Sequence, residues 1–212
     1  GQYVATCQQL RHLIDLNGAP SADSIGPMLV HNAQVVVANP QRERSIPLDA
    51  FYTGFKKFDI QPDELLTRIR IPMPPANAGS AYYKYMRRNA MDLALMGVSA
   101  YVEVDAGIFR NVRIALTTAG PTPVRSRRAE EVLNGQPVSD EIIVQAVEAV
   151  ASEGKPRSSW RSSAEFRTRL LHDVTILVLQ EALQRAQKTP EEKAAPIPMR
   201  LYPGLEGLLP RP

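Results

Sequence analysis

The strongest constraint on the fold is a pair of adjacent ten-residue segments, 96–105 and 108–117, in which apolar residues recur at every second position. These apolar residues are Val98, Ala100, Val102 and Val104 in the first segment, and Val112, Ile114 and Leu116 in the second. Because side chains alternate between the two faces of a strand, the pattern predicts two strands that share one buried face. The intervening Asp105-Ala106-Gly107 favours a tight turn, so the two segments predict a β-hairpin.

Three helices are predicted after this hairpin. Ser126 precedes the first, over 127–134, and Gly135 ends it. The second starts after Ser139, runs to about Ser152, and carries an apolar stripe of Ile143, Ala146, Val147 and Val150. The third begins with a capping box of Ser162 and Glu165, runs to about Gln187, and repeats apolar residues at Phe166, Leu170, Val174, Leu177 and Val178. Strands followed by helices indicate an α+β fold.

A proline-rich stretch, 72–80, separates this part from an earlier mixed α/β piece. Before it we predict a short helix over 21–31 with Ser21 or Asp23 as its cap, a strand over 33–38, a turn at Asn39–Pro40 with a short return strand, and a strand over 64–71. The predicted domains are therefore 1–75 and 76–188. A tail, 189–212, follows them; its spaced prolines oppose helix, so we expect it to lie extended on a partner chain or to be disordered.

Composition excludes several classes of protein. The 212 residues are 44% hydrophobic with a net charge of +3, which favours a folded chain over a disordered one and gives little support to nucleic-acid binding. No apolar run is long enough to span a membrane. The single cysteine, Cys7, cannot by itself form a disulfide, a zinc site or an iron–sulfur cluster, and it favours a reducing, cytoplasmic location.

The sequence contains no complete motif for catalysis or phosphate binding, whether a dinucleotide or P-loop glycine motif, a G-x-S-x-G elbow or an H-E-x-x-H zinc motif. Three carboxylate pairs, Asp63–Glu64, Glu130–Glu131 and Glu191–Glu192, are interpreted as solvated surface. The three histidines, His12, His31 and His172, have no orienting partner nearby in sequence and are assigned surface or packing roles.

Basic residues form three clusters. They are Lys84/Arg87/Arg88, Arg125/Arg127/Arg128 and Lys155/Arg157/Arg161/Arg167/Arg169. Each cluster is open to two interpretations. One is a solvated positive face, and the other is a docking surface for an acidic partner or a phosphate-bearing cofactor.

Several motifs together resemble a known family. The run K-x-x-R-R-x-x-M-D-x-A from Lys84 to Ala94, the later RIAL…PTPVR from Arg113 to Arg125, and RSSAEFR at 161–167 are similar to the C-terminal domain of the FAD-binding medium subunit of molybdenum hydroxylases, a family that includes carbon monoxide dehydrogenase and xanthine dehydrogenase. Upstream, PSADSIGPMLVHNAQVVVA, RSIPLDAFYTG and DELLTRIRIP are similar to the second lobe of the same subunit's PCMH-type FAD-binding domain. The resemblance covers about residues 19–187.

The resemblance implies three FAD contacts. Asp23 would accept hydrogen bonds from ribityl hydroxyls or a ring N–H, Leu66 would pack on the isoalloxazine, and Lys84 would place a cation near the ring. Without the family, Asp23 is a helix cap, Leu66 a core residue and Lys84 a surface charge on a strand. The family's glycine-rich loop for the pyrophosphate is absent, so FAD would be shared with a first lobe that this chain does not carry.

The function implied by the resemblance is that of a flavin subunit, or part of one, which passes electrons from molybdenum and [2Fe–2S] centres on other chains through FAD to an external acceptor. The expected partners are a molybdenum-binding large subunit, a [2Fe–2S] small subunit and a chain with the first FAD lobe. The alternatives are a flavin-free structural subunit of such a complex and a basic nucleic-acid-binding module.

Overall fold

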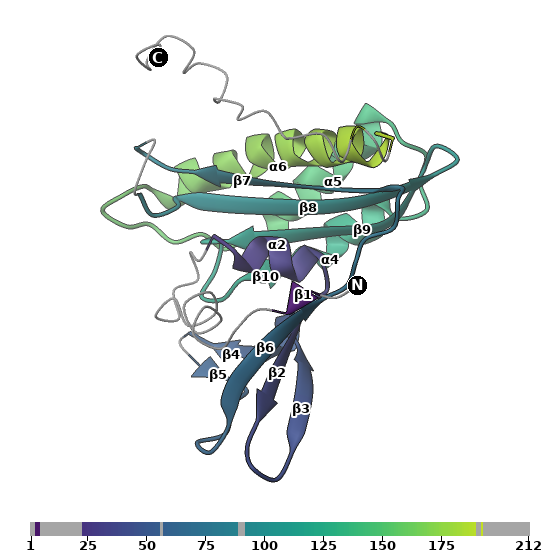
Figure 1. The fold of residues 1–212 in the computed structure, drawn as a ribbon. Helices are drawn as coiled ribbons and strands as arrows, with labels where there is room; N and C mark the ends of the chain where they lie inside the picture. The colour runs from purple at the N-terminus through teal and green to yellow at the C-terminus, as the bar shows by residue number, and fades with distance from the viewer. Residues whose placement is uncertain (1–2, 5–22, 56, 89–91, 190–191, 193–212) are drawn as a thin grey trace, which may run out of the picture.

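A computed structural model describes residues 3–4, 23–55, 57–88, 92–189 and 192. In it, two four-stranded antiparallel sheets are joined by an exposed connection over 72–77. The helix α2 (Ile25–Val30) lies on one face of the C-terminal sheet, and three helices cover the other face (Figure 1). The predicted α+β class is therefore confirmed.

The C-terminal sheet has the strand order β10-β9-β8-β7. Its strands are β7 (Ala78–Tyr85), β8 (Met96–Asp105), β9 (Ile108–Thr117) and β10 (Val124–Arg125). The predicted hairpin is confirmed at both ends of both strands. Its turn residues Ala106 and Gly107 have φ angles of 48° and 76°, the left-handed values that a two-residue hairpin turn of this hand requires.

One face of this sheet packs on three helices, α4 (Arg127–Leu133), α5 (Asp140–Glu153) and α6 (Ala164–Ala186). The alternate residues Val98, Ala100 and Val102 of β8 are fully buried in this core. The predicted stripe on α5 is buried as expected, and Ser139 caps the helix by accepting a hydrogen bond from the Ile142 N–H. On α6, Leu170, Val174 and Val178 are buried.

Four details of the helix predictions are wrong. Ser126 stands at the N-cap of α4 but makes no capping bond, because its hydroxyl donates to the Glu153 carboxylate instead. The N-cap of α6 is Ser163, whose hydroxyl accepts a hydrogen bond from the Phe166 N–H. Ser162 instead forms an antiparallel β-bridge with Ser159. Phe166 and Leu177, predicted to be core, are 42% and 45% exposed.

The N-terminal sheet has the order β1-β6-β2-β3, from β1 (Tyr3–Val4), β6 (Leu65–Ile71), β2 (Gln34–Ala38) and β3 (Glu43–Pro47). Between β3 and β6 lie a short helix, α3 (Leu48–Phe51), and a small pair of strands, β4 (Tyr52–Gly54) and β5 (Lys57–Phe58). The predicted turn after β2 is confirmed, since the Asn39 side chain accepts from the N–H groups of Gln41 and Arg42.

The carboxylate pairs were predicted to be solvated, and for two of them this is wrong. Glu64 is only 5% exposed because its carboxylate binds the Arg44 guanidinium at 2.8 Å and accepts from the Gln61 N–H. The hydrogen bonds from Arg44, and then the one from Gln61, lower the pKa of Glu64 to about 2. Glu130 is equally buried, because its carboxylate binds the Arg125 guanidinium.

Among the described helices, none is long and apolar enough to cross a membrane. No cluster of three or more His, Cys, Asp or Glu side chains suited to a metal ion occurs in the described ranges. The predictions for Cys7, His12, Ser21, Glu191 and almost all of the tail fall outside the described residues.

Candidate functional site

Helix α2 links the two sheets and so positions the candidate site. It is short and nearly all of its residues are buried, with Ile25, Leu29 and Val30 packed against the N-terminal sheet and against Tyr101 and Ala115 of the C-terminal sheet. Its last carbonyl, that of Val30, accepts a hydrogen bond from the buried Arg113 on β9. The helix is therefore fixed at its C-terminal end, which leaves its N-terminal end over the strands β7 and β8.

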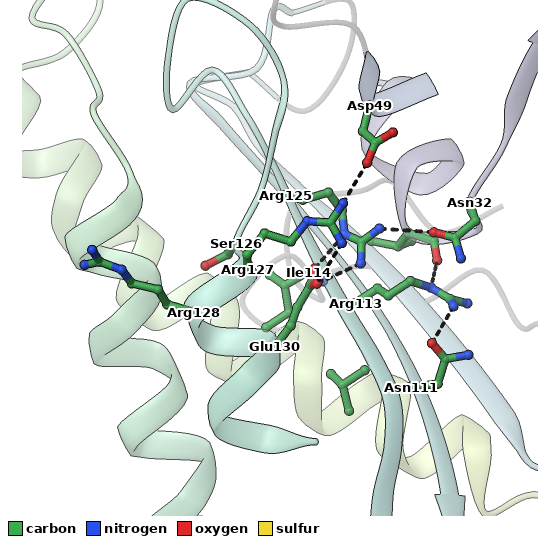
Figure 2. Close-up of polar contacts among 12 residues, drawn as sticks. Asn32, Asp49, Asn111, Arg113, Ile114, Arg125, Ser126, Arg127, Arg128 and Glu130 are labelled. Carbon is green, nitrogen blue, oxygen red and sulfur yellow. Dashed lines mark hydrogen bonds and ion pairs between the residues drawn. The ribbon is translucent and has the colours of Figure 1, made fainter. Parts of the chain in front are cut away.

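A buried ion pair strengthens this connection (Figure 2). The Glu130 carboxylate on α4 binds the Arg125 guanidinium at 2.8 Å and accepts a hydrogen bond from the Ile114 N–H at 2.9 Å. Both side chains of the pair are 7% exposed. Arg125 also donates to the Asn32 side chain just after α2, at 3.1 Å.

A second ion pair bridges the same two parts of the chain. Arg127 of α4 binds Asp49 of α3 at 2.7 Å, with both side chains partly exposed (Figure 2). Two of the three arginines in the second basic cluster therefore have partners within the chain. The interpretation as a docking surface is wrong for Arg125, whose side chain is buried, and stays a prediction for Arg127, which is 56% exposed.

The structure brings two of the three predicted site residues together. Lys84 Nζ lies 2.7 Å from Asp23 Oδ2, and the Tyr82 hydroxyl donates to Asp23 Oδ1 at 3.3 Å. Asp23 directly precedes α2, yet it does not cap the helix, whose N-cap Ser24 makes no capping bond either. The Asp23 side chain is 49% exposed and that of Lys84 is 19% exposed, so the carboxylate keeps a solvent-facing side.

Two buried hydroxyls adjoin this pair, and sequence reasoning missed both. Ser99 Oγ and Thr117 Oγ1 are inaccessible to solvent and have no hydrogen-bond partner among the described residues. A side chain at Gly26 of α2 would meet Ser99 Oγ at 2.5 Å, and one at Gly97 of β8 would meet Thr117 Oγ1 at 2.2 Å. Close backbone approach at these glycines therefore lets the hydroxyls lie directly under α2. The only sequence signal was that Gly97, Ser99 and Thr117 fall on the positions that alternate with the apolar core residues.

Leu66 lies on a different sheet from Asp23 and Lys84. It is partly buried on β6, opposite Val37, and packs against the core around α2 and the N-terminal sheet. Its partner Val37 lies near the C-terminal end of β2, whereas α2 precedes the N-terminal end of that strand. Of the two sequence-based interpretations, packing against the core is observed, and contact with a flavin stays a prediction.

His31, at the C-cap of α2, has a packing role. Its Nε2 lies 3.1 Å from the Ser80 hydroxyl on β7, and its ring packs edge-on against Tyr101 at 5.2 Å between centroids. Burial, and then the positive charge of Arg113, lower the pKa of His31, which keeps the ring neutral at pH 7. Tyr101 donates to Glu103 at 2.6 Å, and burial followed by that hydrogen bond raises the Tyr101 pKa.

Comparisons with known proteins connect this geometry to a family. The family described as FAD binding domain in molybdopterin dehydrogenase matches residues 15–74, and the CO dehydrogenase flavoprotein C-terminal domain matches 81–182. The xanthine dehydrogenase FAD-binding subunit of Escherichia coli O157:H7 is 37% identical over 171 residues, which are 80% of this chain and 59% of that protein. The carbon monoxide dehydrogenase medium chain of Afipia carboxidovorans is 30% identical, over 81% of this chain and 58% of that protein.

A solved structure agrees with both domain matches. The structure of carbon monoxide dehydrogenase from Hydrogenophaga pseudoflava superposes with a TM-score of 0.76 at 28% identity, over 79% of this chain and 58% of that one. The chain thus spans a little under three fifths of the length of the relatives it matches. With both domain matches, these relatives and this shared fold, the chain belongs to the family of FAD-binding subunits of the molybdenum hydroxylases, alongside xanthine dehydrogenase FAD subunits and carbon monoxide dehydrogenase medium chains.

Proposed function

We propose that this chain is an FAD-binding electron-transfer subunit, or part of one, in a cytoplasmic molybdenum hydroxylase complex. One observation supports this above all. The ion pair of Asp23 and Lys84 joins a residue of the segment matched as an FAD-binding domain to a residue of the segment matched as a flavoprotein C-terminal domain. A polar site built from both segments is what a cofactor shared between them requires. We accordingly divide the chain into a second FAD lobe, 1–75, a C-terminal domain, 76–188, and a tail, 189–212.

The residues at this site fit FAD chemically. Asp23 offers a half-exposed acceptor, and the Lys84 ammonium and the Tyr82 hydroxyl beside it offer donors. A ligand with several hydroxyl, carbonyl and ring N–H groups, such as FAD, supplies partners for groups of this kind. Ser99 and Thr117 lie beneath α2 and take no part in this fit.

Each predicted residue then has a defined part. Asp23 would accept from ribityl hydroxyls or a ring N–H, Leu66 would pack against the ring system, and Lys84 would stabilise negative charge next to the ring. FAD, when bound, supplies the capacity to accept electrons and pass them to an external acceptor. The electrons would come from a molybdenum-binding large subunit by way of a [2Fe–2S] small subunit. Substrate oxidation would therefore take place on another chain.

The test is the FAD content of the purified chain, measured by its visible absorbance, with partner subunits and the first FAD lobe supplied. We expect stoichiometric FAD, and about 10- to 100-fold weaker FAD binding in Asp23→Asn, the range for loss of a hydrogen bond to a charged group. Asp105→Asn, at the exposed turn between β8 and β9, is the matched control and should bind FAD normally. Equal affinity in the two variants would contradict a role for Asp23.

A second measurement separates this proposal from its alternative. The glycine-rich pyrophosphate loop is not found in the 212 residues, so we expect the isolated chain to bind FAD far below stoichiometry. The same absence favours the alternative, a flavin-free structural subunit. A complex that carries molybdenum and iron–sulfur centres but no FAD, even with the first lobe present, would support that alternative.

A further inference from the structure

The loop that enters α6 carries positive charge that the described residues largely leave without acidic partners. Residues 154–163 and the first turns of α6 hold five basic side chains: Lys155, Arg157, Arg161, Arg167 and Arg169. In the described part of the chain, only Arg169 of these five has a carboxylate partner, Glu165 at 2.8 Å. The first two basic clusters are different, because Lys84, Arg88, Arg125 and Arg127 each bind an acidic side chain of the chain itself.

Arg167 is the unusual member of this cluster. The residue is 7% exposed, and its Nη2 donates to the Ser159 hydroxyl at 2.9 Å. Its Nε is inaccessible and lacks a hydrogen-bond partner among the described residues. Burial, and then the positive charges of Arg157 and Arg161, lower the Arg167 pKa. A buried guanidinium in this state is destabilising unless an anion binds it.

The loop that holds Arg167 is ordered by hydrogen bonds of its own. Ser159 and Ser162 pair through both backbone N–H groups, at 2.9 and 3.2 Å, and the Ser158 hydroxyl accepts from the Ala164 N–H. This arrangement places Trp160 at the tip with 83% of its surface exposed, and the Arg161 guanidinium lies over its ring at 5.1 Å. Exposed tryptophan beside arginine is typical of the residues that dominate binding energy in protein interfaces.

The loop also has a defined place in the fold. The Lys155 N–H donates to the Ala119 carbonyl just beyond β9, and Phe166 of α6 packs edge-on against Tyr85 at the end of β7. The loop therefore lies at the end of the C-terminal sheet where β7 ends and β8 begins, the same end as Lys84 (Figure 1). A partner docked on it would adjoin the candidate site.

We propose that residues 155–167 form a docking site for an acidic segment of a partner protein, with one carboxylate of that segment bound to Arg167. The Nε and Nη2 atoms form one edge of the guanidinium, and Ser159 occupies only the Nη2 half of it. A carboxylate that takes the place of the Ser159 hydroxyl binds both N–H groups of that edge, which is the preferred bidentate geometry. Arg157 and Arg161 then face further acidic side chains, and Trp160 covers apolar side chains of the segment.

Protein fits this site better than nucleic acid or free phosphate. Binding of single-stranded nucleic acid uses several stacked aromatic rings, whereas the loop offers one, Trp160, and the net charge of the chain is only +3. Free phosphate has no use for the exposed Trp160 ring or for the half-exposed Phe166 in the first turn of α6. The docking site makes no use of flavin, so it stands or falls independently of the proposed function.

The chain contains a built-in reporter, because Trp160 is its single tryptophan. We would titrate the full chain, without FAD, with a peptide of about twelve glutamate and leucine residues that lacks aromatic side chains. Trp160 emission should shift to shorter wavelength and become less accessible to the neutral quencher acrylamide. Arg167→Lys and the double variant Arg157→Ala/Arg161→Ala should each weaken binding at least about tenfold, since Lys cannot form the bidentate pair.

Three controls make the result decisive. Arg110→Ala removes one positive charge from an exposed position on β9, and Arg169→Ala removes one from an arginine that is already paired; both should bind as the wild type does. Far-UV circular dichroism checks the fold, and the double variant keeps the test valid if Arg167→Lys is unfolded, because Arg157 is exposed and Arg161 half-buried. Equal weakening by Arg110→Ala would overturn the proposal, because binding would then follow net charge alone. An unchanged Trp160 signal with the peptide, or protection by inorganic phosphate but not by the peptide, would also overturn it.

Discussion

The buried pair of Arg125 and Glu130 leads to the most demanding prediction. Glu130→Gln removes the negative charge while it keeps the shape and one oxygen to accept from the Ile114 N–H. The Arg125 guanidinium, 7% exposed, then loses its carboxylate partner and keeps the neutral Asn32 amide as a partner. Removal of one member of a buried ion pair costs about 3–5 kcal/mol, because the remaining charge stays desolvated.

The contacts of Glu130 place the expected loss of stability at the lower end of this range. The retained acceptor for Ile114 avoids the penalty of about 1–3 kcal/mol for an unpaired buried N–H, so we expect the lower end, about 3 kcal/mol. Arg127 lies 3.6 Å from Glu130 and is 56% exposed, so Arg127→Ala should cost about 1 kcal/mol or less. The double variant Glu130→Gln/Arg125→Met removes both charges and should recover at least half of the loss.

Urea unfolding followed by circular dichroism gives the free energy of unfolding for each variant. A loss of about 3 kcal/mol corresponds to a fall in melting temperature of about 6–12 °C for a chain of this size. If Glu130→Gln loses no more than Arg127→Ala, or if the separate losses of Glu130→Gln and Arg125→Met simply add in the double variant, the pair is not coupled and the reasoning is refuted.

Four further predictions follow. Lys84→Met should make the flavin of the assembled complex harder to reduce, because negative charge on the ring loses its cation; potentiometry with Arg110→Met as control tests this, and an unchanged potential would leave Lys84 as a partner of Asp23 only. Ser163→Ala should lower stability by about 0.5–2 kcal/mol through loss of the bond to the Phe166 N–H, whereas Ser162→Ala should stay within about 0.5 kcal/mol; the reverse order would restore Ser162 as the cap. Glu64 has a folded pKa of about 2 against 4.5 for the free side chain, so its contribution to stability is complete above pH 4.5 and disappears as the pH falls to about 2; acid titration of Glu64→Gln should lack this part of the wild-type curve. Gly79→Ala would bring a methyl group within 2.1 Å of the Ala182 carbonyl and 2.3 Å of the Ala186 N–H, so it should force α6 away from β7 and cost about 1–3 kcal/mol, and a melting temperature equal to the wild type would contradict this packing.

The sequence predicts best where structure is local. The hairpin of β8 and β9 follows from a strict two-residue period and a turn whose residues must adopt positive φ, and all of these signals lie within 22 residues. The cap at Ser139 follows from the same kind of short-range chemistry. At the start of α6, the capping box of Ser162 and Glu165 placed the cap one residue before the observed cap, Ser163. Ser162 is instead held by the bridge to Ser159, a loop contact that no helix rule contains.

Sequence-based prediction fails where the deciding contact joins separate elements of the fold. Glu130 is predicted to lie on the surface, yet it is buried in an ion pair with Arg125. Arg125 also donates to Asn32, 93 residues away along the chain. Asp23 could be read as a cap or as a cofactor ligand, whereas its observed partner is Lys84, 61 residues later. The contacts that bury Glu130, to Arg125 and to the Ile114 N–H, depend on how α4 packs on β9. The contact of Asp23 with Lys84 depends on how α2 lies on the C-terminal sheet, which neither segment specifies alone.

The two faces of β8 have different neighbours, and this gives the strand an unusual experimental use. Val98, Ala100 and Val102 face the helices, whereas Gly97, Ser99 and Tyr101 face α2 and the candidate site. Successive positions of one strand therefore belong to two separate environments. A residue-by-residue scan along β8 should lower the melting temperature at even and odd positions alike, since both sets are buried. Only substitutions at the odd positions, which lie on the α2 face, should also change ligand affinity, so affinity and not stability should show a two-residue period.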